Sequence, residues 1–130
     1  METKYVITKN GIVKKEDAAA NIIREISTKE ELTELMERMP YIQTIQAPNG
    51  KVRKELYDLS MMEYDDVEWV KIIKSVYLRK KDKGYEDYET DYMKKAKNFL
   101  YQEIALRFLF PFDETELFVN KTVEKYLKEF

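Results

Sequence analysis

The sequence contains no cysteine and no histidine. Without cysteine the chain forms no disulfides and has no thiol nucleophile. Without histidine it lacks the imidazole that serves most often as a general base and as a zinc ligand. We therefore expect no metal site and no cofactor, and we predict that the protein is not an enzyme.

Glycine and proline are also scarce, with three of each among 130 residues. This composition favours long helices over a turn-rich all-β fold, and the length suits one domain with a single core. The sequence has neither an apolar run of about 18 residues nor an N-terminal segment of signal-peptide type. We therefore expect no contact with a membrane and a cytoplasmic location.

Charged residues are abundant but balanced, at 37% of the chain. The 23 basic and 25 acidic side chains give a formal net charge of −2 and a pI of about 5.4. Such a chain has no global field that would attract nucleic acid. Contact with DNA would have to depend on local basic clusters.

The N-terminal segment predicts a β-hairpin. Asn10-Gly11 separates two short β-favouring runs, and both central residues of the tightest hairpin turns need positive φ. Because a lone hairpin is only marginally stable, it must pack on a helix or pair its edge with another chain. We assign residues 1–21 to this hairpin and a linker, and residues 22–130 to one helical domain.

Helix signals fill that second part. Ser27 and Glu30 have the spacing of a capping box, which predicts a helix that ends before Pro40. Thr90 is a plausible N-cap for a later, longer helix. The further helices are expected near residues 51–61, 65–84, 91–109 and beyond Pro111. The predicted fold is mainly α, a compact bundle of about five helices with a short N-terminal β-hairpin.

The central helix at residues 65–84 has apolar side chains every three or four positions. Asp65 or Asp66 can cap its start, and Gly84 can end it in the left-handed conformation. The predicted structural core of this helix and the next consists of Trp69, Val70, Ile73, Tyr77, Phe99, Leu100, Glu103 and Ile104. Since buried charge must be matched, we expect Glu103 to pair with an Arg or Lys of the central helix.

Basic residues concentrate on the same helix, with six between positions 71 and 83 against one acid. The candidate DNA-contacting residues are Lys51, Arg53, Lys54, Lys71, Lys74, Arg79, Lys80, Lys81 and Lys83. Two interpretations stay open: contact with phosphates, or a solvated helix end that the helix dipole and nearby acids favour. The clusters near residues 51 and 80 would have to lie on one face to act together.

Two segments carry a resemblance to a known family. They are WVKIIKSVYLRKK at 69–81 and, after an acidic turn, DYMKKAKNFLYQEIAL at 91–106. Together with ISTKEEL at 26–32 and Met39-Pro40, they resemble the helical C-terminal domain of CarD-like bacterial transcription regulators. The likeness covers roughly residues 22–127.

The resemblance implies a regulator of transcription without catalysis. Family members join a Tudor-like module that contacts the RNA polymerase β subunit to a helical domain that touches promoter DNA. Residues 1–21 would be a remnant of that module, and RNA polymerase and promoter DNA would be the partners. In part of the family a Trp before the second helix wedges into the minor groove. The matching residues 47–54 contain no Trp, and Trp69 lies at a packing position.

A second function is compatible with the same sequence. The N-terminal hairpin could add its strands to a partner's sheet or to a second copy of the chain. The protein would then be a protein–protein interaction module, with a homodimer as one form.

Overall fold

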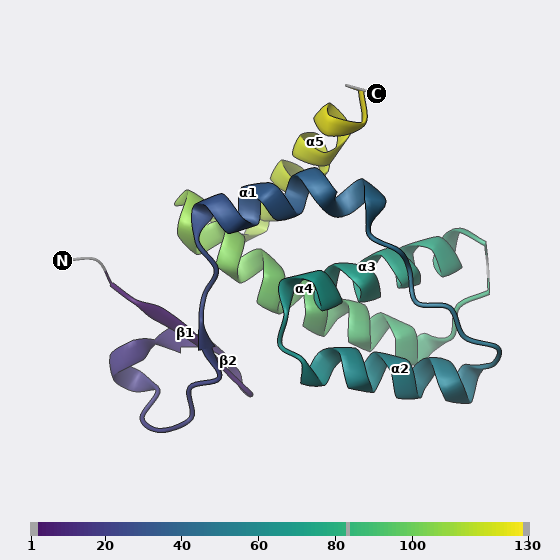
Figure 1. The fold of residues 1–130 in the computed structure, drawn as a ribbon, viewed down its shortest axis with the longest axis horizontal. Helices are drawn as coiled ribbons and strands as arrows, with labels where there is room; N and C mark the ends of the chain where they lie inside the picture. Colours follow the sequence, from purple (N-terminus) through teal and green to yellow (C-terminus); the bar gives the residue numbers. More distant parts are fainter. Residues whose placement is uncertain (1–2, 83, 129–130) are drawn as a thin grey trace. The chain divides into compact units, whose positions relative to one another are not determined.

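The computed structural model describes residues 3–82 and 84–128, with side chains up to residue 125. These residues form five α-helices and one three-stranded antiparallel sheet (Figure 1). The helices are α1 (Lys29–Arg38), α2 (Gly50–Met62), α3 (Asp66–Lys81), α4 (Asp87–Phe108) and α5 (Thr115–Lys128). The strands are β1 (Tyr5–Thr8), β2 (Gly11–Lys14) and β3 (Arg24–Glu25). The predicted class, mainly α with an N-terminal hairpin, is confirmed.

The chain forms two compact units. Unit 1 consists of Met1–Glu37 and Tyr101–Phe130, and unit 2 consists of Arg38–Leu100. The boundary that we placed between residues 21 and 22 falls inside unit 1, because β3 lies beyond it and pairs with β1. None of the helices in the described part of the chain combines the length and apolar character needed to cross a lipid bilayer.

The sheet of unit 1 has the strand order β2-β1-β3. Thr8 pairs with Gly11, so Lys9 and Asn10 form the loop and the predicted Asn10-Gly11 turn is wrong. Among residues 8–11 only Gly11, the first residue of β2, has positive φ, at 134°. The Thr8 hydroxyl accepts a hydrogen bond from the Asn10 amide (3.2 Å) and donates one to the Gly11 carbonyl (2.9 Å), which closes the loop without a second positive φ.

A polar clasp in unit 1 links the segment after β3 to the end of α4. Glu103 is fully buried, and its Oε1 accepts hydrogen bonds from Arg24 Nη1 (3.0 Å) and the Ser27 amide (2.8 Å). Arg107 donates to the Ser27 carbonyl (2.7 Å) and the Ile26 carbonyl (3.2 Å). Glu103 therefore has a matching cation, as buried charge requires, and that cation is Arg24 of β3, where we expected a residue of the central helix.

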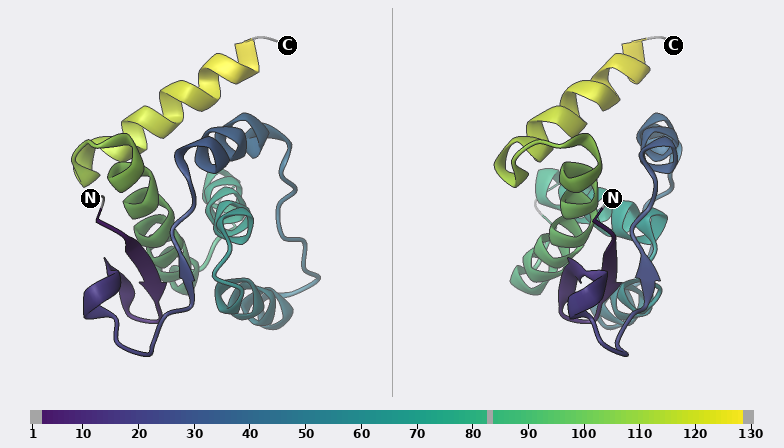
Figure 2. Two further views of the ribbon diagram at one scale, coloured as in Figure 1. Left: turned by 60° about the vertical axis from the view of Figure 1, so that its left-hand side comes forward. Right: turned by 90° about the vertical axis from the view of Figure 1, so that its left-hand side faces the viewer.

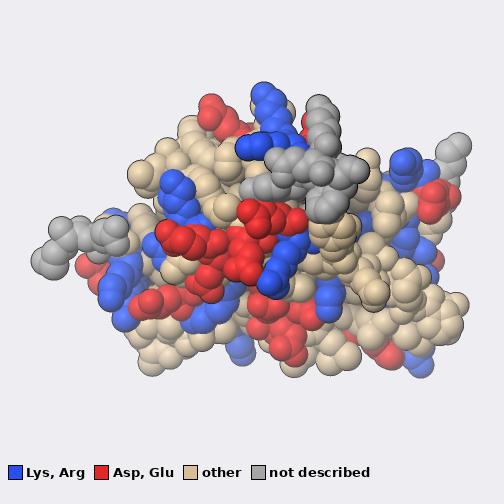
Figure 3. All heavy atoms as spheres, turned by 45° about the horizontal axis from the view of Figure 1, so that its top comes forward, with Lys and Arg blue, Asp and Glu red and all other residues tan. Residues whose placement is uncertain are grey.

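The clasp also explains where α1 begins. Because the Ser27 amide is bonded to Glu103, the capping box lies one residue later than predicted. Thr28 Oγ1 accepts from the Glu31 amide (3.1 Å), and Glu31 Oε1 accepts from the Thr28 amide (3.0 Å). The helix that this box opens exposes Glu30, Glu31, Glu34 and Glu37. Figure 3 shows acidic side chains gathered on this face.

The C-terminal end of α4, which lies in unit 1, turns sharply into α5, as Figure 2 shows. Leu109 adopts a left-handed conformation with φ of 59°, and the Phe110 amide donates back to the Ala105 carbonyl (3.2 Å). A short 3-10 turn, Phe112–Glu114, then precedes α5. Near the C-terminus, Phe130 and the side chains of Tyr126 and Leu127 lie outside the described residues.

In unit 2, α3 buries a face centred on Trp69, Ile72 and Val76, with Val70 beside them. The Trp69 ring stacks on Phe99 of α4 at a centroid distance of 4.9 Å and an interplanar angle of 8°. On the same helix Ile73 is only half-buried. Tyr77 is 59% exposed, because the buried face runs through Trp69, Ile72 and Val76, and this corrects the prediction that Tyr77 is a core residue. Phe99 is half-buried and Leu100 is buried; in unit 1, Ile104 is buried too.

The ends of the unit 2 helices differ from those predicted. Asp65 occupies the N-cap of α3, but its side chain makes no cap hydrogen bond. At the other end Asp82 is the C-cap, two residues before Gly84, and the Gly84 amide donates back to the Arg79 carbonyl (3.0 Å). The next helix, α4, already begins at Asp87, so Thr90 lies inside it and is not its cap.

Candidate functional site

The first turn of α2, the last turn of α3 and the first turn of α4 lie at one end of unit 2 (Figure 1). The Tyr88 hydroxyl of α4 donates to the Gly50 carbonyl of α2 (3.3 Å). Arg79 of α3 donates to Glu89 of α4 (2.7 Å). The fold therefore brings the basic clusters near residues 51 and 80, which are distant in sequence, to the same end of the unit.

A buried carboxylate holds this end together. Glu89 is fully buried, and its Oε1 accepts hydrogen bonds from the Tyr57 hydroxyl of α2 (2.7 Å) and from Arg79 Nε of α3 (2.7 Å). Its Oε2 accepts from the Glu86 amide (2.7 Å), which satisfies a free donor at the start of α4. One side chain thus connects three helices.

The ionisation of this group follows from its contacts. Burial raises the pKa of Glu89, but the hydrogen bonds from Arg79, the Glu86 amide and Tyr57 outweigh it, so the net pKa is lowered. Burial and the Glu89 carboxylate raise the pKa of the Tyr57 hydroxyl. The hydrogen bond to Glu89 also raises the pKa of Arg79. At neutral pH, Glu89 is therefore a carboxylate that accepts from a neutral phenol and a guanidinium.

Three of the nine candidate DNA-contacting residues are engaged within unit 2. Besides Arg79, Lys74 donates to the carbonyls of Met39 (2.8 Å) and Ile42 (2.5 Å), and burial lowers the pKa of its ammonium. Lys71 Nζ lies 3.1 Å from Glu68 Oε1. These cations hold loops and helices in place within the unit.

Four other candidates are exposed at the shared end: Lys51, Lys54, Lys80 and Lys81. We call these four residues the basic end. The Lys80 ammonium lies over the ring of Tyr85, 5.4 Å from its centroid. Arg53 is half-buried, one helical turn before Tyr57, and Lys83 lies outside the described residues. Exposed acids, among them Glu55, Glu86 and Asp87, are interspersed with these cations.

Sequence reasoning missed the central member of this arrangement. Glu89 lies in the acidic turn between the segments 69–81 and 91–106, and it was not among the candidate residues. A signal was nevertheless present, because Glu89, Met93, Ala96 and Leu100 follow one another at helical spacing. Glu89 lies one turn before the apolar stripe of α4 and on the same helix face. Its position therefore predicts a second buried carboxylate, like Glu103.

In the described part of the chain, no group of three or more acidic side chains could hold a metal ion. Comparison with known proteins found no family model and no curated protein that matches this chain.

Proposed function

We propose that this protein is a non-enzymatic transcription regulator that contacts promoter DNA through the basic end of unit 2. The observation that carries the proposal is the convergence of Lys51 and Lys54 of α2 with Lys80 and Lys81 of α3. Four exposed ammonium groups at one end of a compact unit can contact successive phosphates of a DNA backbone. The proposal also rests on the resemblance of α3 and α4 to the CarD-like helical domain.

The charge distribution supports the choice of this end. The exposed face of α1 in unit 1 bears Glu30, Glu31, Glu34 and Glu37, which would repel phosphates (Figure 3). Because the net charge is −2, binding must be local, weak and sensitive to salt. Phosphate contacts of this kind position a protein on DNA but do not read its sequence.

Fluorescence anisotropy with a forked promoter fragment at low salt tests the proposal. The variant Lys80→Glu/Lys81→Glu should bind the fragment about tenfold more weakly or worse. The slope of log affinity against log salt concentration should become shallower by about one unit for each lost phosphate contact. The variant Lys51→Glu/Lys54→Glu should show the same loss, because both pairs belong to one surface.

A matched control is Lys121→Glu/Lys125→Glu on α5, which removes two exposed cations of unit 1. It changes the net charge equally and should retain most of the affinity. Equal losses in all three variants would mean that only net charge matters. No binding by the unaltered protein at low salt would refute the DNA proposal.

A second function is favoured by the position of β2 at an edge of the sheet. An edge strand presents unpaired backbone groups that another strand can complete. The hairpin would then pair with RNA polymerase, another partner or a second copy. Capture of purified RNA polymerase by this protein tests the polymerase as the partner. Light scattering of the protein alone tests a second copy, and a strict monomer at high concentration excludes self-pairing.

A further inference from the structure

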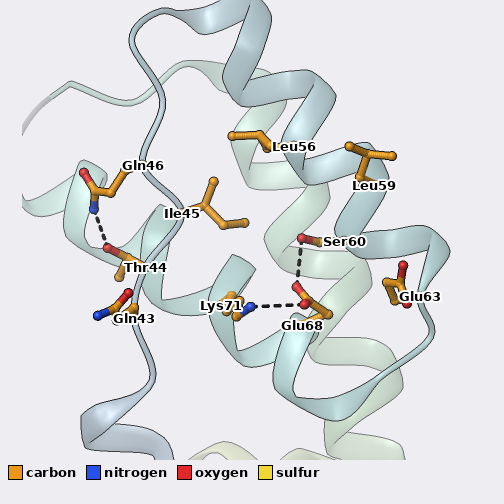
Figure 4. Close-up of a pocket in the computed structure, with 10 residues that line it drawn as sticks. All are labelled: Gln43, Thr44, Ile45, Gln46, Leu56, Leu59, Ser60, Glu63, Glu68 and Lys71. Carbon is orange, nitrogen blue, oxygen red and sulfur yellow. Dashed lines mark hydrogen bonds and ion pairs between the residues drawn. The ribbon is translucent and has the colours of Figure 1, made fainter.

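Unit 2 contains a groove away from its basic end, between α2, α3 and the extended loop 43–46 (Figure 4). Its volume is about 400 Å³, within the range of ligand-binding sites in proteins. The apolar wall consists of Ile45, Leu56 and Leu59, and Figure 4 shows Ile45 pointing from the loop toward α2. The side chains of Glu63, Glu68 and Lys71 supply the charged part of the lining.

The groove has fixed walls. The Ile45 amide donates to Ser75 Oγ (2.8 Å), and Ser75 in turn donates to the Lys71 carbonyl (2.6 Å). Just before the loop, the Lys74 ammonium donates to the Met39 and Ile42 carbonyls. Hydrogen bonds at Ile42 and at Ile45 thus hold this loop against α3. A preformed site of this kind binds a ligand without the cost of ordering its own walls.

The charge inside the groove is unbalanced. Glu68 Oε2 accepts from Ser60 Oγ (3.0 Å), and its Oε1 lies 3.1 Å from Lys71 Nζ, so this carboxylate is oriented and neutralised. Glu63 adds a second, exposed carboxylate at the end of α2. Two carboxylates face one ammonium group, which leaves one negative charge beside an apolar wall.

We propose that this groove binds a basic side chain, Arg or Lys, from an extended segment of a partner protein. Such a side chain has an aliphatic stem that can lie along Leu56 and Leu59, and a cation that can reach Glu63. One residue type therefore satisfies both parts of the lining.

A peptide segment fits better than a small free cation because the apolar surface continues beyond the groove. Leu56, Leu59 and Met62 follow one another at three-residue spacing on α2. Leu56 is half-buried, whereas Leu59 is 59% and Met62 73% exposed. This ridge offers contacts to an apolar neighbour of the basic residue, as exposed apolar patches at interaction sites do.

The test is an NMR titration of the isotope-labelled full chain with the blocked peptide acetyl-Ala-Leu-Arg-Leu-Ala-amide. A matched peptide carries citrulline, the uncharged isostere of arginine, in place of Arg. The arginine peptide should shift the backbone resonances of residues 43–46, 56–63 and 68–71, and the citrulline peptide should bind about tenfold more weakly. Glu63→Gln should reduce the affinity for the arginine peptide to the citrulline level, and Leu59→Ser should weaken binding of both peptides.

The control variant is Glu55→Gln, which removes an exposed carboxylate from α2 outside the groove and should leave binding unchanged. Any one of four results overturns the proposal: no shifts at millimolar peptide, equal binding of both peptides, free arginine amide binding as tightly as the peptide, or a dimer that Leu59→Ser dissociates. The last two would assign the groove to a small cation or to a second copy. Glu63→Gln leaves the basic end intact, so the affinity of this variant for DNA should not fall. The proposal for the groove and the proposal of DNA binding can therefore fail separately.

Discussion

Arg79 Nε donates a 2.7 Å hydrogen bond to Glu89 Oε1, and this bond fastens the last turn of α3 to the first turn of α4. The Glu89 side chain is completely buried, whereas 26% of the Arg79 side chain is exposed. Arg79 also donates to the Gly84 carbonyl in the connection between the two helices. The pair thus fixes the last turn of α3, which carries Lys80 and Lys81, against α4. Because Glu89 also accepts from Tyr57, it sets where that turn lies relative to α2.

Replacing Glu89 by alanine should therefore destabilise the protein strongly. The change leaves the Arg79 guanidinium and the buried Tyr57 hydroxyl without their shared acceptor, and breaking a buried pair in this way typically costs about 3–5 kcal/mol. Chemical denaturation measures this as a fall in the free energy of unfolding. Asp87→Ala, which removes an exposed acid from the same turn, should cost no more than about 1 kcal/mol through the helix dipole. Similar losses in both variants would contradict the structural role of Glu89.

The lowered pKa of Glu89 predicts how stability depends on pH. Its carboxylate is favoured in the folded state, so its contribution is fully present above the ordinary value of 4.5 and is lost as the pH falls through the lower folded pKa. The difference in unfolding free energy between the unaltered protein and Glu89→Gln should be constant near neutral pH. It should then shrink below pH 4.5. A difference that stayed the same into strongly acidic solution would show that Glu89 is not ionised in the fold.

The sequence allowed the helices to be predicted but not where they end. Apolar spacing reports which residues share a face, and that pattern extends over many positions. A helix end, in contrast, depends on which of several adjacent polar side chains forms the few hydrogen bonds to the free backbone groups there. Thr28 caps α1 in place of Ser27 because Glu103, distant in sequence, binds the Ser27 amide. Glu89 likewise starts α4 before Thr90 by accepting from the Glu86 amide.

The basic clusters show the same limit at the candidate site. Their presence is evident from composition, but the sequence could not show which cations turn inward. Lys74 is bound by carbonyl groups of residues 39–42, more than thirty positions away. Arg79 is bound by a carboxylate that looked like one of several solvated acids. Only the folded arrangement separates these structural cations from the exposed Lys80 and Lys81.

The two ion pairs of unit 1 that involve Glu103 and Glu25 should differ widely in their contribution to stability. Glu103 is buried, and it binds both Arg24 and the Ser27 amide, so Glu103→Gln should cost about 1.5–3 kcal/mol through weakened charged hydrogen bonds. The pair of Glu25 with Lys15 is exposed (3.3 Å), with 55% and 49% of the side chains accessible. Glu25→Gln should therefore cost less than about 1 kcal/mol. Thermal or urea unfolding of both variants tests the contrast, which equal effects would rule out.

Leu109 offers the opposite test, a substitution that should stabilise the protein. It ends α4 with a φ of 59°, a conformation that costs an L-residue about 1–2 kcal/mol. Its side chain is 89% exposed, while Phe108 and Phe110 on either side pack against Phe118 at centroid distances of 5.1 and 4.9 Å. Leu109→Gly removes the backbone strain and loses almost no packing.

The gain from Leu109→Gly is reduced by the greater freedom of glycine in the unfolded chain, about 0.5–1 kcal/mol, so the net stabilisation should be about 0.5–1 kcal/mol. Leu117→Gly on α5 is the matched control, since Leu117 is also exposed (59%) but lies within a helix. That variant should lose about 1 kcal/mol, the usual cost of glycine inside a helix. A gain in unfolding free energy for Leu109→Gly together with a loss for Leu117→Gly would assign the gain to the left-handed backbone of Leu109. A loss in both variants would show that the Leu109 side chain contributes to folding.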